Sequence, residues 1–223
     1  MFHKKIITVI ELYTSAILIF TSFFTIINPL GTMPIFMSMT SSLSKTHRKQ
    51  TAKKATIVAF LTVIAFAFSG QILFNFFGIS VNSFRIVGGI IFFMMGWDML
   101  QARLGNFKHT EDEDQIDAYV EDISVTPLAI PMICGPGAIT NAIILMEAAP
   151  KISQKIVLIS VIAFVLLLTY LILVGASKIT EKLGATGNKV MMRLMGLIVM
   201  VIAVEFFFSG LKPILLGILN NGS

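Results

Sequence analysis

Two long segments without a single charged residue constrain the fold of this chain more than any other feature. They run over residues 56–79 and 156–177. An α-helix rises about 1.5 Å per residue, so about 20 residues cross the ~30 Å hydrocarbon core of a bilayer. Only 13% of the residues are charged, whereas a soluble domain carries about 25%. The sequence therefore predicts an integral membrane protein.

Further apolar stretches extend this pattern to six expected membrane spans. We expect them at residues 12–42, 56–77, 83–102, 123–149, 156–176 and 190–216. A bilayer offers no water to open backbone groups, and the alternating pattern of a transmembrane barrel is absent, so each span is expected to be helical. The predicted fold is an all-α integral membrane protein with six transmembrane helices.

Two pairs of landmarks indicate an internal repeat. The pattern Arg-x-x-Gly occurs at Arg85 in the third span and again at Arg193 in the sixth span. Asn28-Pro29 in the first span and Gly135-Pro136 in the fourth span have nearly the same separation along the chain. Each half holds three spans, an odd number, so the second half is expected to insert upside down, as in many secondary transporters. Chance similarity between apolar stretches is the alternative.

The repeat divides one transmembrane domain into three parts. We expect a first three-span repeat at residues 1–104, a cytoplasmic polar linker at residues 105–122 and the inverted second repeat at residues 123–223. The loops on the side of the linker carry eleven lysines and arginines, against six on the other side. The positive-inside rule then predicts a multi-pass protein of the cell (inner) membrane with both termini outside. The same distribution accounts for the net charge of +5 without a nucleic-acid partner.

Prolines and glycines cluster in the first and fourth spans. The first span contains Asn28-Pro29-Leu30-Gly31-Thr32-Met33-Pro34, and the fourth contains Pro131 followed by Gly135-Pro136-Gly137-Ala138-Ile139-Thr140-Asn141. Proline removes a donor and clashes with the preceding turn, and glycine permits unusual backbone angles. The clusters predict that both helices are discontinuous, ending near Ile27 and Ile133 and beginning again near Thr32 and Gly137. The freed backbone groups must then be buried in protein or line a cavity.

Broken helices of this kind suit a zwitterion. A half-helix N-terminus attracts a carboxylate, and the free carbonyls of a half-helix C-terminus attract an ammonium group or a cation. The candidate substrate-binding residues are Asn28, Pro29, Gly31, Thr32, Pro34, Gly135, Pro136, Gly137, Ala138, Thr140 and Asn141. Three alternatives stay open: kinks that serve packing alone, an ion channel or cation transporter that uses the same carbonyls, and a non-transporting assembly protein.

These two stretches resemble the two signature stretches of the MarC family, and the resemblance extends to chain length, span count and the polar central linker. Members are also described as six-span neutral amino acid transporters. The resemblance implies an inverted-repeat fold with the substrate between the discontinuous first and fourth spans. It further implies transport of small neutral amino acids such as glycine and alanine, coupled to protons. Drug efflux is not inferred from the family's name.

Four charged residues within or near the spans are candidates for coupling transport to an ion. Glu205 lies deepest in its span, and Asp98, Arg85 and Arg193 lie nearer to span ends. Intramembrane carboxylates are functional candidates by default. Snorkelling of the long side chains to the interface is the alternative for the two arginines.

We expect no catalysis and no cofactor. Cys134 is the single cysteine, the three histidines lie in tails or loops, and no metal-ligand spacing or nucleotide-binding motif is present. The acidic run at residues 111–114 lacks the glycine and spaced ligands of a calcium loop, so we interpret it as part of a solvated linker. The expected partners are the lipid bilayer, a small neutral amino acid and a proton or cation. A homo-oligomer is left open.

Overall fold

The computed structural model describes residues 2–101 and 113–221, and within these ranges it is helical throughout, without a strand. Five helices are long and apolar enough to cross a membrane, and a bent pair brings the number of candidate spans to six. The predicted all-α multi-pass membrane fold is therefore confirmed at this level.

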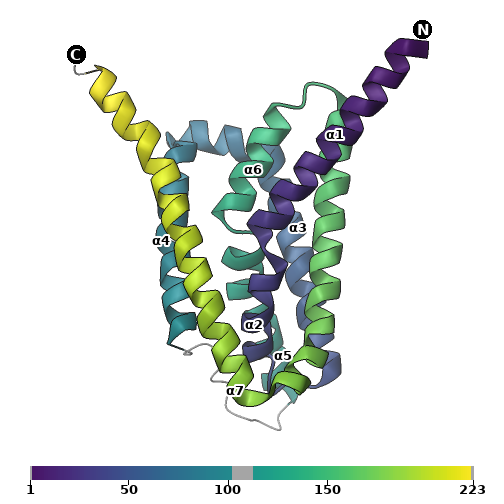
Figure 1. Cartoon of the computed structure of the whole chain (residues 1–223), viewed down its shortest axis with the longest axis vertical. Coiled ribbons are helices and arrows are strands. Elements are labelled where there is room, and N and C mark those ends of the chain that lie inside the picture. Colours follow the sequence, from purple (N-terminus) through teal and green to yellow (C-terminus); the bar gives the residue numbers. More distant parts are fainter. Residues whose placement is uncertain (1, 102–112, 222–223) are drawn as a thin grey trace.

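The described part of the chain contains eight helical segments in sequence. They are α1 (Phe2–Ile27), α2 (Pro29–Met39), α3 (Lys45–Phe77), α4 (Val81–Leu100), α5 (Glu113–Ile123), the irregularly wound segment η1 (Ser124–Ile133), α6 (Pro136–Glu147) and α7 (Ile152–Asn221). The start of α1 and the end of α7 lie at the same end of the molecule (Figure 1).

Local signals set the ends of α3 and α4. Ser44 caps α3 by accepting a hydrogen bond from the N–H of His47, so the helix begins well before the predicted span at residue 56. Gly78 closes α3 with a left-handed backbone (φ 64°), and Ser80 then caps α4. Apolarity marks the part of a helix that lies in the membrane, whereas caps mark where the helix begins.

The second half of the predicted polar linker at residues 105–122 is helical. Residues 113–123 form helix α5, while residues 105–112 lie outside the described part of the chain. Val120 and Ile123 on one face of α5 are buried, and Glu113 and Asp114 are exposed. The apolar residues at helical spacing among the acidic ones give the segment a face that packs on the bundle.

Helix α7 comprises two candidate spans, Ile152–Ala176 and Lys189–Leu219. Gly184 lies between them with φ 64° and ψ −178°, angles that glycine adopts without steric cost. The chain therefore turns back at this point (Figure 1), and the second half of α7 runs beside α4.

The two helices α4 and α7 approach at backbone distance. A methyl group built on Gly96 would lie 2.8 Å from the carbonyl oxygen of Gly196, and one built on Gly196 would lie 2.7 Å from the carbonyl oxygen of Gly96. Small residues at such crossings allow membrane helices to gain close van der Waals contact where lipid provides no hydrophobic driving force between helices.

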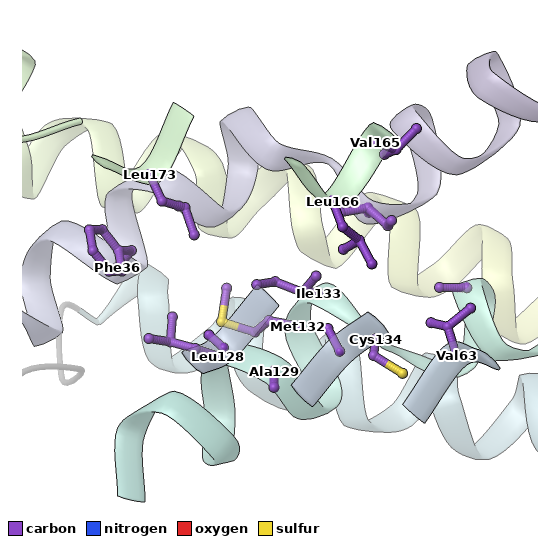
Figure 2. Close-up of a cluster of buried hydrophobic side chains, with 14 of the residues drawn as sticks. Phe36, Val63, Leu128, Ala129, Met132, Ile133, Cys134, Val165, Leu166 and Leu173 are labelled. Atoms are coloured by element: carbon purple, nitrogen blue, oxygen red, sulfur yellow. The ribbon is translucent and has the colours of Figure 1, made fainter. Parts of the chain in front are cut away.

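The buried core is centred on η1, the segment between α5 and α6. Leu128, Ala129, Ile133 and Cys134 are each fully shielded from solvent. Figure 2 shows these side chains close to Phe36 of α2, to Val63 of α3 and to Leu166 and Leu173 of α7. One side of the segment with the least regular backbone is thus enclosed by protein, whereas its two extended residues, Thr126 and Ile130, are exposed.

Candidate functional site

The chain leaves helical geometry at a single residue between α1 and α2. Asn28 has a left-handed backbone (φ 45°, ψ 66°), a conformation that asparagine tolerates better than most residues. Its N–H donates to the carbonyl of Phe24 at 3.0 Å, and its side-chain oxygen accepts from the N–H of Gly31 at 3.1 Å. Asn28 therefore ends α1 and caps α2, with Pro29 in the first position of the new helix.

Two expectations for this segment need correction. Helix α2 begins at Pro29 rather than near Thr32, and it continues through Pro34. The carbonyls before the break are also less free than expected, because the Thr32 hydroxyl lies 3.3 Å from the carbonyl oxygen of Asn28 and 3.5 Å from that of Ile27. A proline in the second turn of a helix interrupts few hydrogen bonds, so a helix as short as α2 accommodates it.

The irregular segment before α6 is longer than the sequence analysis expects. Thr126 and Ile130 have extended backbone angles inside η1. Each of them precedes a proline, Pro127 or Pro131, and the proline ring disfavours helical geometry at the residue before it. The chain then bends by 59° between η1 and α6.

The start of α6 differs from the start of α2 in its capping. Gly135 is the N-cap residue and provides no side-chain hydrogen bond, and Pro136 occupies the first helical position without an N–H of its own. The N–H groups of Gly137 and Ala138 follow at the next two positions, where a helix leaves donors unsatisfied. Both residues are buried. Of the two half-helix N-termini, that of α6 is the one left open to an anionic group.

Tertiary contacts bring the end of α1 against the start of α6. A methyl group built on Gly137 would lie 2.9 Å from Cγ2 of Ile26 in α1 and 2.9 Å from Cζ of Phe206 in α7. One built on Gly135 would lie 2.4 Å from Cζ of Phe92 in α4. The glycines of this stretch are therefore packed against side chains of three other helices.

A cavity of about 40 Å³ lies beside Asn28. Its polar wall comes from the chain around the α1–α2 break, and its remaining walls are apolar side chains of α4, η1 and α7. The lining consists of Ile26, Ile27, Asn28, Gly31, Thr32, Ile35, Phe92, Met95, Met99, Met132, Val199 and Ile202. None of these residues carries a formal charge.

Thr140 in α6 differs from the other buried threonines. Each of the others donates its hydroxyl to the carbonyl four residues earlier; they are Thr32, Thr40, Thr51, Thr56 and Thr169. The hydroxyl of Thr140 has no hydrogen-bond partner among the residues that the structure describes, although the residue is only 2% exposed. A buried hydroxyl without a partner costs about 1–3 kcal/mol.

The direction of Thr140 follows from helix geometry. At about 100° per residue, its position lies between those of Pro136 and Gly137 around α6. Pro136 packs on Gly88 of α4, and Gly137 packs on Ile26 and Phe206. The free hydroxyl therefore lies on the face of α6 that is directed towards Ile26 and Phe206.

The remaining predicted substrate residues have structural contacts. Asn141 donates from Nδ2 to the hydroxyl of Ser22 at 2.9 Å and so ties α6 to α1. Pro29, Pro34 and Ala138 are buried within their helices. Among the predicted residues, only Asn28, Gly31 and Thr32 line the cavity.

The four candidate coupling residues lie away from the cavity. Glu205 and Arg193 are exposed on α7, and Asp98 and Arg85 are partly exposed on α4. The two ion pairs found in the described part of the chain, His47 with Asp117 and Lys54 with Glu121, involve none of them.

Sequence reasoning missed two residues that hold the end of α2. Arg48 of α3 donates to the carbonyls of Thr40 at 2.8 Å and Ser41 at 2.7 Å. Tyr119 of α5 donates its hydroxyl to the carbonyl of Met39 at 2.9 Å. Basic residues after a helix that ends in a polar turn are the one signal that points to such a contact.

The described residues include no cluster of three histidine, cysteine, aspartate or glutamate side chains that could hold a metal ion. Cys134 is fully buried in the core, as a small packing residue would be.

Comparison with known proteins gives a consistent result. The model of a family described as MarC family integral membrane protein matches residues 13–215. A UPF0056 membrane protein of Pyrococcus horikoshii is 41% identical over 203 residues, which cover 91% of this chain and 97% of the relative. The UPF0056 membrane protein YvbG of Bacillus subtilis is 37% identical over 87% of this chain and 92% of its own length, and YhcE of Escherichia coli is 34% identical over 90% and 94%. No solved structure matches this chain.

Proposed function

Since this chain belongs to the MarC family of integral membrane proteins, we propose that it is a secondary transporter of small neutral amino acids of the glycine and alanine class. The observation that carries the proposal is the uncharged cavity beside Asn28, which a layer of side chains including Ile26 and Phe92 separates from the uncapped N-terminus of α6 and the unpartnered hydroxyl of Thr140. In this proposal, α1–α2 and η1–α6 are the two discontinuous membrane helices.

The two ends of a zwitterion are assigned to the two breaks. The carboxylate accepts hydrogen bonds from the N–H groups of Gly137 and Ala138 and from the hydroxyl of Thr140. The ammonium group faces the polar wall at Asn28 and Thr32, where carbonyl oxygens end α1. A zwitterion brings no net charge into a site without charged residues, whereas a lone cation would have no counter-charge there.

The apolar walls account for the choice of a small, neutral side chain. Met95, Met99, Val199 and Ile202 form the side of the cavity opposite the polar wall. A cavity needs about 10–15 Å³ to hold one water, so 40 Å³ accommodates only a few waters, and even glycine has five non-hydrogen atoms. We therefore interpret this conformation as closed.

Opening requires movement of the side chains between the cavity and α6. Ile26 and Phe92 line the cavity and also lie against Gly137 and Gly135, and the Phe206 ring lies 6.4 Å from the Phe92 ring. We propose that rocking of one repeat against the other shifts this layer and joins the cavity to the α6 N-terminus.

Equal spacing of helix starts supports the two-repeat organisation. Helices α2 and α6 both begin with proline, at Pro29 and Pro136. Helices α3 and α7 begin at Lys45 and Ile152, so this second pair of starts has the same separation along the chain as the first. Inverted repeats with both termini outside the cytoplasm, in the inner membrane, are the organisation that we propose.

We further propose that transport is coupled to protons. Glu205 is a carboxylate within a candidate span, exposed and on the same helix as the cavity residues Val199 and Ile202. A carboxylate at such a site can bind a proton, and its change of charge then acts on the helix that forms part of the cavity wall.

Uptake by proteoliposomes tests the function directly. We expect saturable accumulation of radiolabelled glycine and alanine, stimulated by an imposed proton gradient, and no accumulation in liposomes without protein. Parallel measurement of potassium and sodium flux tests the rival ion pathway. Robust cation flux without saturable uptake of any small amino acid would replace the transporter assignment with that of a channel.

A further inference from the structure

A second hollow lies on the outside of the helix bundle, between α3 and the first half of α7. Its volume is about 510 Å³, more than ten times that of the cavity beside Asn28. Lys49 and Lys53 of α3 form one end, and Ile57 and Phe60 continue along the same helix. Leu167 of α7 faces them across the hollow.

The residues on α3 form one stripe with a polar end and an apolar end. Lys49, Lys53 and Ile57 are four residues apart and therefore lie on the same face of the helix. At about 1.5 Å per residue, the two lysines precede Ile57 by about 12 and 6 Å along the axis. The uncharged stretch of α3 begins directly after Lys54, so the lysines lie at the level of a bilayer interface.

The α7 side of the hollow also has a polar end and an apolar end. Tyr170 lies at the lysine end of α7 and Ala163 at the Phe60 end, since the two helices run in opposite directions. A tyrosine at this level is typical of the membrane interface, where its ring is apolar and its hydroxyl is wet. Leu167 between them is 52% exposed, so the floor of the hollow is open to lipid.

The positive charge at the polar end is not balanced within the protein. Two neighbouring side chains have acidic partners: His47 lies 3.7 Å from Asp117, and Lys54 lies 2.6 Å from Glu121. Lys49 and Lys53 are exposed, and the described part of the chain contains no acidic group within salt-bridge distance of either. Two lysines four residues apart on a helix repel each other, and an anion between them removes that cost.

We propose that this groove binds an anionic phospholipid. The phosphate and its headgroup lie between Lys49 and Lys53, and one acyl chain lies along Ile57, Phe60 and Leu167. A zwitterionic lipid would match the apolar floor equally well but would bring its own cation beside two lysines. Preference for net negative charge therefore distinguishes the groove from the ordinary lipid-facing surface.

Native mass spectrometry of the detergent-purified full chain tests the proposal. The protein is titrated with phosphatidylglycerol or with phosphatidylcholine of the same acyl chains, and bound lipid is counted. Each lysine near an anionic lipid surface contributes about a factor of five in affinity, so we expect roughly thirty-fold preference for phosphatidylglycerol. The double variant Lys49→Gln, Lys53→Gln should lose most of that preference.

Two further variants make the result specific to the groove. Lys151→Gln with Lys155→Gln removes the same charge from lysines that are also four residues apart, at the opposite end of the spans, and should keep the preference. Ala163→Phe fills the apolar end, where Ala163 is exposed, and should weaken binding of both lipids.

Several outcomes would overturn the proposal. An unchanged preference in the Lys49→Gln, Lys53→Gln variant would show that the headgroup binds elsewhere, as would an equal loss in the Lys151→Gln, Lys155→Gln control. A dimer that is lost in Ala163→Phe while lipid binding stays intact would assign the groove to a second copy of the chain. None of these readings depends on whether the protein transports amino acids.

Discussion

Replacement of Thr140 by valine should stabilise the empty protein and weaken its binding of substrate. The two side chains are both β-branched and have nearly the same shape, so packing changes little. The wild-type hydroxyl is 2% exposed and lacks a partner, and this arrangement costs about 1–3 kcal/mol. Removing the hydroxyl should return that free energy to the folded state. For a chain of this length it corresponds to a rise in Tm of roughly 2–12 °C.

The effect on ligand should have the opposite sign. A hydroxyl that donates to a carboxylate contributes about 1.5–3 kcal/mol, so Thr140→Val should bind glycine and alanine about ten- to hundred-fold more weakly. Thermal unfolding in detergent, with and without glycine, measures both quantities, because a ligand that binds only the folded state stabilises it by RT ln(1 + L/Kd), where L is the free ligand concentration, and so raises Tm more when Kd is lower.

Thr169 provides the matched control. It is fully buried in α7, but its hydroxyl donates to the carbonyl of Val165 at 2.8 Å. Thr169→Val therefore removes a satisfied hydrogen bond, and we expect an unchanged or slightly lower Tm and unchanged ligand binding. A lower Tm for Thr140→Val would refute the assignment of an unpartnered hydroxyl. A higher Tm with wild-type affinity would keep that assignment and remove Thr140 from the substrate site.

Three other substitutions test separate parts of the structure. Gly137→Ala should lower Tm and uptake, since overpacking costs about 1–3 kcal/mol. The control Gly175→Ala, with open space around it, should leave both unchanged or raise Tm. Similar Tm values for the two variants would contradict the close packing at Gly137. Arg48→Gln should lower the free energy of unfolding by on the order of 2 kcal/mol, because carbonyls at the end of α2 lose a charged donor; an unchanged Tm would show that these bonds contribute nothing. Glu205→Gln should flatten the pH profile of uptake in proteoliposomes, and a wild-type profile would exclude Glu205 from coupling.

The membrane spans were predictable because each depends on local sequence. A run of about 20 apolar residues suffices to cross the bilayer wherever it occurs. The same holds for two helix ends: α1 ends at Ile27 and η1 ends at Ile133, as the adjoining proline and glycine clusters indicate. The extended residues Thr126 and Ile130 both precede proline, which favours such a backbone, but Met33 before Pro34 stays helical, so this signal alone does not decide the outcome.

Other features could not be predicted because they depend on where neighbouring elements lie. Helix α2 continues through Pro34, and α5 forms from a segment that reads as a polar linker. The ion pair between Lys54 and Glu121 and the hydrogen bond from Tyr119 to Met39 stabilise α5 through contacts with α3 and α2. Such contacts join residues far apart in the chain and leave no local pattern in it.

Hydropathy and proline geometry act over a few neighbouring residues, so the amino-acid sequence was enough to establish an all-helical membrane protein and to point to Asn28-Pro29 and residues 131–136 as the two places of interest. What lies at those two places depended on the packing of the whole chain. Packing brought Ile26 against Gly137, left Thr140 without a partner, and closed the cavity beside Asn28 with methionines and aliphatic residues of α4 and α7. Residues of four separate segments meet there, and their meeting follows from helix packing, which no single stretch of sequence encodes.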